Sequence, residues 1–244
     1  HPGENGVLEG YFDLLNIPYQ SAGVFVSSLT FDKFYCNHML RGLGVKCPPS
    51  VLFTQPLPGN AEEVAEKIGF PCFVKPNNGG SSIGVSKVNE VEGLELAFKK
   101  AFATGEYVIV ERFVSGVELT CGVLRDNGEV RPLAVTEIQY AGEFFDYEAK
   151  YSSSKTKEIT PAQISDHQYQ RCLEISGRIF RLLNVKGFFR VDFIMSDDEF
   201  YVIEVNTVPG MSEKSLLPQQ IAYCDIEPQI MFTQEIERLL GASS

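Results

Sequence analysis

The sequence predicts an α+β fold made of two units. Strand-like apolar runs are mixed with helical segments along all 244 residues, and no segment repeats at a fixed period. Two strand-like runs over 117–125 and 129–138 flank Asp126-Asn127-Gly128, which is a strong signal for a β-hairpin. The pattern changes just before this hairpin, and we therefore place the division between the two units near 114–117.

Hydrophobic periodicity predicts the elements that precede the hairpin. Over 91–102, for example, Leu94, Phe98 and Ala101 share one face of a helix. The stretch 77–84 is rich in glycine, asparagine and serine and can form only a loop. The expected helices cover 7–18, 30–43, 61–68 and 91–102, and the expected strands cover 23–26, 70–74 and 107–110.

One long polar segment separates the elements that follow the hairpin. Residues 141–160 are polar and irregular, and loops of this length within a compact domain are commonly either functional lids or disordered. Thr160-Pro161 is expected to open a helix that runs to about Leu183. Strands over 188–195 and 200–207 follow, and a helix near the C-terminus completes the chain.

Composition argues against several classes of function. Asp and Glu number 32 against 21 for Lys and Arg, so the net charge of −11 disfavours a nucleic-acid-binding protein. No apolar run approaches the roughly 18 residues of a membrane span, so we expect no membrane association. Cysteines scattered without a C-x-x-C pair argue against a zinc site and suit a reducing cytoplasm. These cysteines are Cys36, Cys47, Cys72, Cys121, Cys172 and Cys224.

Four polar residues on the last two predicted strands form the most informative pattern. Because side chains alternate with a period of two, Arg190 and Asp192 share one face of the first strand, and Glu204 and Asn206 share one face of the second. If 196–199 forms a tight turn, Asp192 comes within about one residue of lying opposite Glu204. Two carboxylates and an amide oxygen suit Mg²⁺ and suit zinc poorly. The alternative is a solvated polar face on an edge hairpin, but both strands are otherwise apolar and buried acids need a partner.

Lys75 ends a predicted strand and is followed by the glycine-rich loop. A lysine and several backbone N–H groups in this order suit a phosphate group. Neither the Walker pattern G-x-x-x-x-G-K-[ST] nor the dinucleotide pattern G-x-G-x-x-G occurs in the chain. Taken alone, such a segment is more often an ordinary turn.

Glu111, near the end of the apolar run 108–114, and Glu118 shortly after it form a third pattern. A carboxylate with strand-end backbone groups suits the adenine amino group, and a second carboxylate suits ribose hydroxyls. In isolation, a strand end with charged caps is the stronger interpretation. The order of the three patterns along the chain is what points to a function.

That order resembles the D-alanine–D-alanine ligase family of the ATP-grasp superfamily, from Gly3 to the C-terminal helix. The segments D-Y-E-A-K-Y (146–151) and E-V-N-T-V-P-G-M (204–211) are specific within ATP-grasp enzymes, whereas the other segments indicate only the superfamily. The matching segments are Lys33, F-V-K-P-N-N-G-G-S-S-I-G from Phe73, V-I-V-E-R-F-V from Val108, D-Y-E-A-K-Y, F-R-V-D-F from Phe189 and I-E-V-N-T-V-P-G-M from Ile203.

The resemblance implies an ATP-grasp fold, in which two α+β domains hold ATP in a cleft between them. It assigns 29–116 to the central domain and 117–244 to the C-terminal catalytic domain, preceded by a remnant of an α/β N-terminal substrate domain over 1–28. The chain starts in a polar, glycine-rich stretch without Met, so we expect most of that domain to lie upstream. A family glutamate that contacts the first D-alanine belongs to the missing part.

The resemblance also implies residue roles. Lysines would reach the ATP phosphates, two Mg²⁺ ions (or Mn²⁺) would bind to the acidic strands, and Arg190 and the Gly210 N–H would stabilise a tetrahedral species. The expected ATP-binding residues are Lys33, Lys75, Ser82, Glu111, Arg112, Val114 and Glu118, and the expected metal ligands are Asp192, Glu204 and Asn206. The expected catalytic residues are Arg190, Lys150, Ser81, Tyr151 and Gly210, and Ser215 and Leu216 are expected to hold the second D-alanine carboxylate.

The implied reaction makes D-alanyl-D-alanine for peptidoglycan precursor synthesis, and so serves cell wall biogenesis and cell shape. ATP phosphorylates the first D-alanine to an acyl phosphate, the amine of the second attacks, and phosphate leaves. Since the acyl phosphate hydrolyses easily, lids over 141–160 and 79–84 are expected to close. The family also implies a cytoplasmic protein that forms a homodimer at full length.

Two alternatives remain open. The first is an ATP-grasp ligase with D-lactate or D-serine as the second substrate, against which the intact D-Y-E-A-K-Y loop with Tyr151 favours D-alanine. The second is a nucleotide-binding fragment that is inactive without its N-terminal domain.

Overall fold

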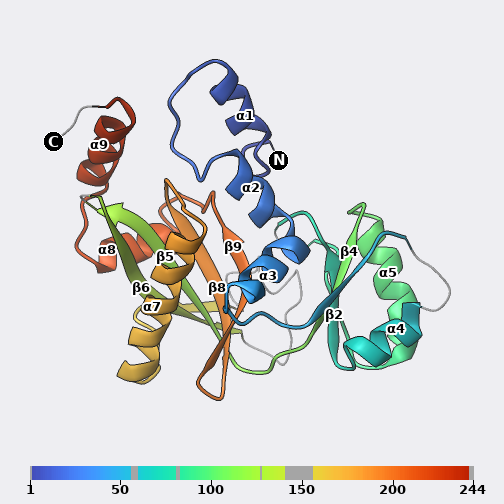
Figure 1. Ribbon diagram of the computed structural model, residues 1–244. Coiled ribbons are helices and arrows are strands. Elements are labelled where there is room, and N and C mark those ends of the chain that lie inside the picture. Colours follow the sequence, from blue (N-terminus) through green and yellow to red (C-terminus); the bar gives the residue numbers. More distant parts are fainter. Residues whose placement is uncertain (1, 56–59, 81–82, 127, 141–155, 242–244) are drawn as a thin grey trace. The chain divides into compact units, whose positions relative to one another are not determined.

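A computed structural model describes residues 2–55, 60–80, 83–126, 128–140 and 156–241 (Figure 1). The chain forms two compact units. One comprises residues 32–116 and 140–157 and is called the β1–β4 unit below. The other comprises residues 1–31, 117–139 and 158–244 and is called the β5–β9 unit. Both mix helices with antiparallel strands, which confirms the predicted α+β class.

The β1–β4 unit is a four-stranded sheet in the order β1-β4-β2-β3. Its strands are β1 (Ser50–Phe53), β2 (Cys72–Pro76), β3 (Ser86–Val88) and β4 (Val108–Arg112). Its helices are α3 (Lys33–Gly42), α4 (Asn60–Lys67) and α5 (Leu94–Phe102), with a short turn of 3-10 helix η1 (Val91–Gly93) before α5.

The apolar core of this unit lies between one face of the sheet and the helices α4 and α5. Cys72 and Val74 of β2 alternate with Phe73 and Lys75, so only the first pair enters this core. The helices contribute residues such as Val64, which is fully buried. The opposite face of β2 and β4 therefore carries the side chains that the sequence singled out for chemistry.

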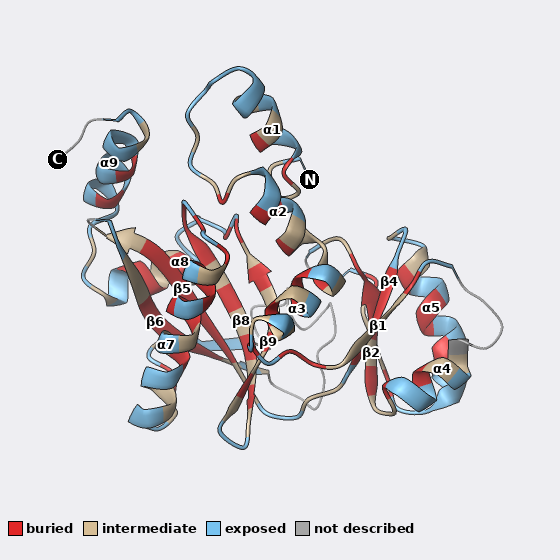
Figure 2. Ribbon diagram, in the orientation of Figure 1, coloured by how far each residue is buried: buried red, intermediate tan, exposed pale blue. Residues whose placement is uncertain are grey.

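The β5–β9 unit is a five-stranded sheet in the order β7-β6-β5-β8-β9. Its strands are β5 (Val117–Asp126), β6 (Glu129–Tyr140), β7 (Thr156–Ile159), β8 (Phe189–Ser196) and β9 (Glu199–Asn206). Its helices are α1 (Val7–Leu14), α2 (Val24–Phe31), α7 (Asp166–Leu182), α8 (Leu216–Tyr223) and α9 (Pro228–Leu239). Buried residues are concentrated along β5, β6 and β8 (Figure 2).

Strand β8 has the strict alternation that the sequence predicted. Phe189, Val191 and Phe193 are fully buried, whereas Arg190 and Asp192 are only partly buried and lie on the other face. The turn to β9 is tight, and Asp197 and Asp198 both have positive φ angles of 47° and 65°. Such a pair is characteristic of the two-residue turns that match the twist of a hairpin.

A β-bulge in β9 determines where Glu204 points. Phe193 pairs with Val202, but the next residue of β8, Asp192, pairs with Glu204, so Ile203 is an extra residue. Plain alternation from the buried Val202 would send Glu204 into the core. The extra residue restores Glu204 to the polar face, as bulges beside functional sites commonly do.

Two sequence predictions about the elements are wrong. The strand expected over 23–26 is the start of helix α2, whose buried residues Val26, Ser27 and Thr30 recur at helical spacing. Its β-branched and aromatic residues mimic a strand pattern. The helix expected to open at Thr160-Pro161 begins only at Asp166, because Ser165 and Gln168 form a capping box.

The short strands β1, β3 and β7 were not predicted, because three or four residues show too little periodicity. Strand β7 lies within the predicted loop over 141–160, of which 141–155 are outside the described residues. The C-terminal region has two helices, α8 and α9, where one was expected. Among the described residues, no helix is long and apolar enough to cross a membrane.

Candidate functional site

The polar face of β8 and β9 carries two pairs of opposed side chains. Asp192 lies opposite Glu204, and Arg190 lies opposite Asn206. Sequence reasoning placed Asp192 within about one residue of Glu204, and the structure confirms that they are partners. The bulge makes this register compatible with both acids on one face.

Asp192 is held by hydrogen bonds from Arg190 and Thr120. Arg190 donates from Nε to Oδ1 and from Nη2 to Oδ2, both at 2.8 Å. Thr120, which lies opposite Asp192 on β5, donates from its hydroxyl to Oδ1 at 2.6 Å. Charged hydrogen bonds in a two-pronged geometry are among the strongest and most directional in proteins. The carboxylate is therefore fixed in orientation before any ligand binds.

Thr120 is a site residue that the sequence analysis missed. Its side chain is almost fully buried, so its hydroxyl has little choice of partner other than Asp192. A threonine in a strand is unremarkable by composition. The available signal was its spacing of two from Glu118, which places both on one strand face.

The carboxylates around Arg190 dominate its electrostatics. Burial opposes the charge of its guanidinium, but Asp192, followed by Glu204 and Glu118, raises its pKa above the ordinary value. Glu118, expected at the ribose, thus acts on the same arginine as the two expected metal ligands. Arg190 is a permanent cation surrounded by acids.

The donor atoms on this face fit a magnesium ion. Mg²⁺ is usually bound by one or two carboxylates, with phosphate oxygens and water completing its coordination. Asp192 and Glu204 supply the carboxylates, and Asn206 adds an amide oxygen that accepts a 3.0 Å hydrogen bond from the Val208 N–H. No cluster of three or more His, Cys, Asp or Glu residues suited to a metal occurs in the described part of the chain.

The segment from β9 to α8 brings Gly210 and Ser215 together. A Cβ atom added to Gly210 would lie 2.8 Å from the Ser215 Oγ, so the two residues are in close contact. Ser215 occupies the N-cap position of α8 without capping it through its side chain, and Ser212 lies 2.8 Å away, Oγ to Oγ. Leu216 is the first residue of the helix. The predicted substrate residues thus stand at a helix N-terminus, where backbone N–H groups attract an anion.

In the β1–β4 unit, Lys75 and Glu111 form a buried ion pair. The Lys75 Nζ lies 2.6 Å from the Glu111 Oε2, and both side chains are at most a tenth exposed. Asn37 of α3 donates from Nδ2 to the Glu111 Oε1 at 3.1 Å. Both oxygens of the carboxylate expected to meet adenine are thus bound from within the protein.

Asn37 is a second site residue that sequence analysis missed. It lies four residues after Lys33, and residues at this spacing share one face of a helix. The same face of α3 therefore carries a predicted phosphate-binding lysine and the partner of Glu111. A neutral amide within a helical pattern gave no separate signal.

Lys33 is anchored beside the glycine-rich loop. Its Nζ donates to the Gly79 carbonyl at 2.5 Å, and its backbone N–H donates to the Asn77 carbonyl at 3.3 Å. The buried side chain of Asn77 accepts from the Phe34 N–H at 2.9 Å. Lys33 is thus hydrogen-bonded to the start of this loop, and Lys75 lies just before the loop in the sequence.

Other predicted residues are not part of these clusters. Arg112 follows Glu111 on β4, so its side chain points to the other face and donates to the Ile68 carbonyl at 3.0 Å. Val114 is half-buried just beyond the end of β4. Ser81, Ser82, Lys150 and Tyr151 lie outside the described residues.

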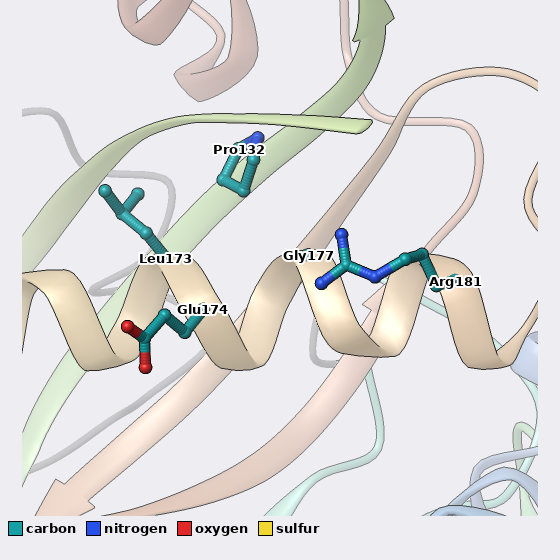
Figure 3. A pocket seen from close by; sticks show the side chains of 5 residues that line it. All are labelled: Pro132, Leu173, Glu174, Gly177 and Arg181. Carbon is teal, nitrogen blue, oxygen red and sulfur yellow. The ribbon is translucent and has the colours of Figure 1, made fainter. Parts of the chain in front are cut away.

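A separate hollow of about 240 Å³ lies between α7 and β6 and contains none of the predicted site residues (Figure 3). The Arg181 guanidinium reaches back over Gly177, where an added Cβ would lie 3.6 Å from its nearer nitrogen (Figure 3). The residues that line the hollow are Pro132, Leu173, Glu174, Gly177 and Arg181.

Two α+β units, one with lysines at a glycine-rich loop and the other with opposed acids on a hairpin, are characteristic of the ATP-grasp class. Within that class the chain belongs to the D-alanine–D-alanine ligase family. The family profile described as "D-ala D-ala ligase C-terminus" matches residues 39–238, which is most of the chain.

Curated relatives and solved structures agree with this membership. The chain is 42% identical to a D-alanine–D-alanine ligase of Phocaeicola vulgatus over 237 residues, covering 97% of the chain and 73% of the relative. It superposes on the ATP complex of the Bacillus anthracis D-alanine–D-alanine ligase with a TM-score of 0.83 at 31% identity, over 99% of this chain and 77% of that one. A D-Ala:D-Ser ligase from Enterococcus faecalis gives a TM-score of 0.83 at 32% identity, with 98% and 69% covered.

Proposed function

We propose that the protein joins two D-alanine molecules to D-alanyl-D-alanine at the expense of ATP, for the synthesis of peptidoglycan precursors. The observation that carries this proposal is the fixed pair Arg190–Asp192 opposite Glu204, in a chain of the D-alanine–D-alanine ligase family. The reaction needs a cation and acidic metal ligands close together, and this strand face supplies both.

In this proposal, Lys33 and Lys75 bind the phosphates of ATP. Each supplies a positive charge next to the loop that starts at Asn77, whose backbone N–H groups can add further donors. When a phosphate takes the Lys75 ammonium group, Asn37 keeps one oxygen of Glu111 bound and leaves the other free to accept from a nucleotide. Arg112 and Val114 would contribute mainly through the backbone beyond Glu111, and Ser82 through the loop.

Asp192, Glu204 and Asn206 would hold two Mg²⁺ ions, which Mn²⁺ can replace. When bound, the metal neutralises charge on the phosphates and favours displacement at the terminal phosphorus. Arg190 and Thr120 hold the Asp192 carboxylate in one orientation, so that it need not reorganise when a ligand arrives.

The chemistry proceeds in two displacements. The carboxylate of the first D-alanine attacks the terminal phosphorus of ATP, ADP leaves, and an acyl phosphate forms. The amine of the second D-alanine then attacks the acyl carbon, loses a proton, and inorganic phosphate leaves. Negative charge develops on the acyl oxygen in the second step, and Arg190 and the Gly210 N–H are the donors proposed to stabilise it. Lys150, Ser81 and Tyr151 are proposed to close over the reacting groups.

The second D-alanine is proposed to bind through its carboxylate at Ser215 and Leu216, at the N-terminus of α8. D-Serine is the alternative acceptor, because the chain is as similar to a D-Ala:D-Ser ligase as to the Bacillus anthracis enzyme. D-Lactate is the third candidate. We further propose that the full-length protein acts in the cytoplasm and as a homodimer.

Phosphate release from Mg-ATP tests the proposal on the full-length protein. D-Alanine should stimulate release, L-alanine should not, and D-serine and D-lactate tested with a low concentration of D-alanine should reveal the acceptor. Equal release with and without D-alanine would show that the protein is not this ligase, and nucleotide binding without release would support a nucleotide-binding role instead.

A further inference from the structure

Helix α8 packs on β5 at Gly122 with no room for a side chain. A Cβ atom added to Gly122 would lie 2.3 Å from the Leu217 Cδ1 and 2.7 Å from the Gln220 Oε1. Leu217 is also part of a buried apolar cluster with Leu124 and Ile221. The contact is therefore a close approach of helix to strand backbone, and it fixes the height of α8 above the sheet.

Gln220 makes this contact specific. Its side chain is fully buried, and its Oε1 accepts from the Gly122 N–H at 2.8 Å. Its Nε2 donates to the Thr120 carbonyl at 3.1 Å and to the Thr136 hydroxyl at 3.0 Å. A buried amide costs free energy unless its groups are paired, and here both ends are paired. One side chain of α8 thus binds the backbone of β5 on both sides of Cys121.

The backbone of β5 needs these partners because its pairing with β6 is irregular here. Cys121 pairs with Val135, but Val123 pairs with Pro132, so the register shifts around Gly122. A proline has no N–H to donate to the neighbouring strand. Gln220 supplies hydrogen bonds where the ladder is interrupted, which explains a polar residue inside an otherwise apolar helix face.

Thr120 links this contact to Asp192. Its carbonyl accepts from Gln220, and its hydroxyl donates to the Asp192 carboxylate. The N-terminal end of α8 carries Ser215 at its N-cap and Leu216 as its first residue. Gln220 is therefore connected through Thr120 to Asp192 on the acidic strand face. It also lies little more than one helical turn from Leu216, one of the predicted acceptor residues.

We propose that Gln220 is a positioning residue for the acceptor substrate, because it locks the N-terminal turn of α8 to the strand that orients Asp192. The inference rests on the proposed function and deepens it. Without the amide, α8 would still pack through Leu217, but its first turn would no longer be held in one position relative to Asp192. The acceptor carboxylate would then bind less well, while activation of the first D-alanine would be little affected.

D-Alanine and hydroxylamine, used as alternative nucleophiles, distinguish binding of the acceptor from activation of the first D-alanine. Hydroxylamine attacks the acyl carbon of an acyl phosphate to give a hydroxamate and release inorganic phosphate, and it has no carboxylate for α8 to bind. In Gln220→Met, which keeps length and volume but removes the hydrogen bonds, D-alanyl-D-alanine formation at subsaturating D-alanine should fall about tenfold. Hydroxamate formation from D-alanine, ATP and hydroxylamine should change less than about twofold, because it needs no positioned acceptor.

The matched control is Met231→Ala. Met231 of α9 belongs to the same apolar cluster as Leu217, so its truncation lowers stability without touching the Gln220 hydrogen bonds. It should leave the ratio of dipeptide to hydroxamate unchanged. Amide hydrogen exchange of the Gly122 N–H gives a readout independent of activity, and it should be faster in Gln220→Met than in Met231→Ala.

If Gln220→Met does not fold, Thr136→Val removes one of the three hydrogen bonds and should shift the ratio in the same direction. An unchanged ratio in the folded variant, or an equal loss of both products, would overturn the positioning role. Failure of the unaltered protein to form either product would instead overturn the proposed function.

Discussion

Arg190 and Asp192 lie two residues apart on β8 and are joined by two hydrogen bonds of 2.8 Å. The period of two places them on one face, and the planar guanidinium matches the two oxygens of the carboxylate. The proposed oxyanion donor and a proposed metal ligand thus orient each other. A change in either should therefore alter both functions.

Arg190→Lys tests this relationship. Lysine keeps the positive charge but cannot bind both oxygens of Asp192 with a rigid fork. We expect kcat for D-alanine-dependent phosphate release to fall by about 10²–10³-fold at saturating substrates, as for the loss of one oxyanion donor. Steady-state kinetics with D-alanine and Mg-ATP measure it.

Arg131→Lys is the matched control for that variant. Arg131 forms an ion pair with Asp126 at the exposed end of the β5–β6 hairpin, in the same unit but without any predicted site residue. Its replacement should leave kcat within about twofold, because surface ion pairs contribute little. A similar fall of kcat in both variants would mean that the Arg190 effect is one of general stability.

Thr120→Val should raise the Mg²⁺ concentration needed for half-maximal rate. Valine keeps the shape of threonine but cannot donate to Asp192, and the loss of a hydrogen bond behind a metal ligand typically weakens metal binding by about tenfold or more. Mg²⁺ titrations at fixed ATP in excess of its KM measure the change. Thr120→Ser retains the hydroxyl and should behave like the unaltered protein, and equal Mg²⁺ requirements in all three would exclude this role.

Asn37→Leu should affect both stability and nucleotide binding. It leaves the buried Glu111 Oε1 without its donor, which costs about 1–3 kcal/mol of unfolding free energy. The Lys75–Glu111 ion pair then lacks the hydrogen bond from Asn37 that holds Glu111 in place, so the KM for ATP should rise as well. Urea denaturation and ATP saturation curves measure the two effects.

Tyr35→Ala, on the exposed side of the same helix, is the comparison for Asn37→Leu. It should change neither quantity by much, since its side chain is mostly in water. If Asn37→Leu lowers stability while the KM for ATP stays the same, then Glu111 acts on folding and not on the nucleotide.

The sequence was sufficient to bring the two acids within about one residue of each other, because strand periodicity and a tight turn are local properties. The shared face of Arg190 and Asp192 needed only a period of two, and the turn length placed Glu204 within about one residue of Asp192. The bulge at Ile203 was not predictable, since it depends on how β9 pairs with β8. The prediction still placed Glu204 on the polar face, because it grouped Glu204 only with Asn206, which lies after the bulge.

The residues that sequence reasoning missed share one property: each is neutral and acts through a partner far along the chain. Thr120 and Asp192 are 72 residues apart, Asn37 and Glu111 are 74, and Gln220 and Gly122 are 98. Periodicity carries no information on such pairs. Helix α2 was missed for a different reason, because its β-branched and aromatic residues satisfy the pattern of a strand as well as that of a buried helix.

The buried thiols predict how stability depends on pH. Burial raises the pKa of Cys121 from 9.0 to about 12. Burial likewise raises the pKa of Cys47 from 9.0 to about 12, although the nearby Arg41 cation lowers it and Glu111 raises it by smaller amounts. Above pH 9 the unfolded chain loses these protons while the folded protein keeps them, so the unfolded state binds fewer protons and stability falls as pH rises.

The stabilisation from these thiols should therefore be complete below pH 9 and decline between pH 9 and 12. Each thiol should contribute a loss of about 1.4 kcal/mol per pH unit in this window. Urea denaturation under reducing conditions at pH 8, 9 and 10 measures the slope. The double variant Cys47→Ala, Cys121→Ala has a lower stability at pH 8 through lost packing, but its decline above pH 9 should be shallower because two titrating groups are gone. Parallel declines in the two proteins would show that other groups, and not these thiols, determine the alkaline limit of the fold.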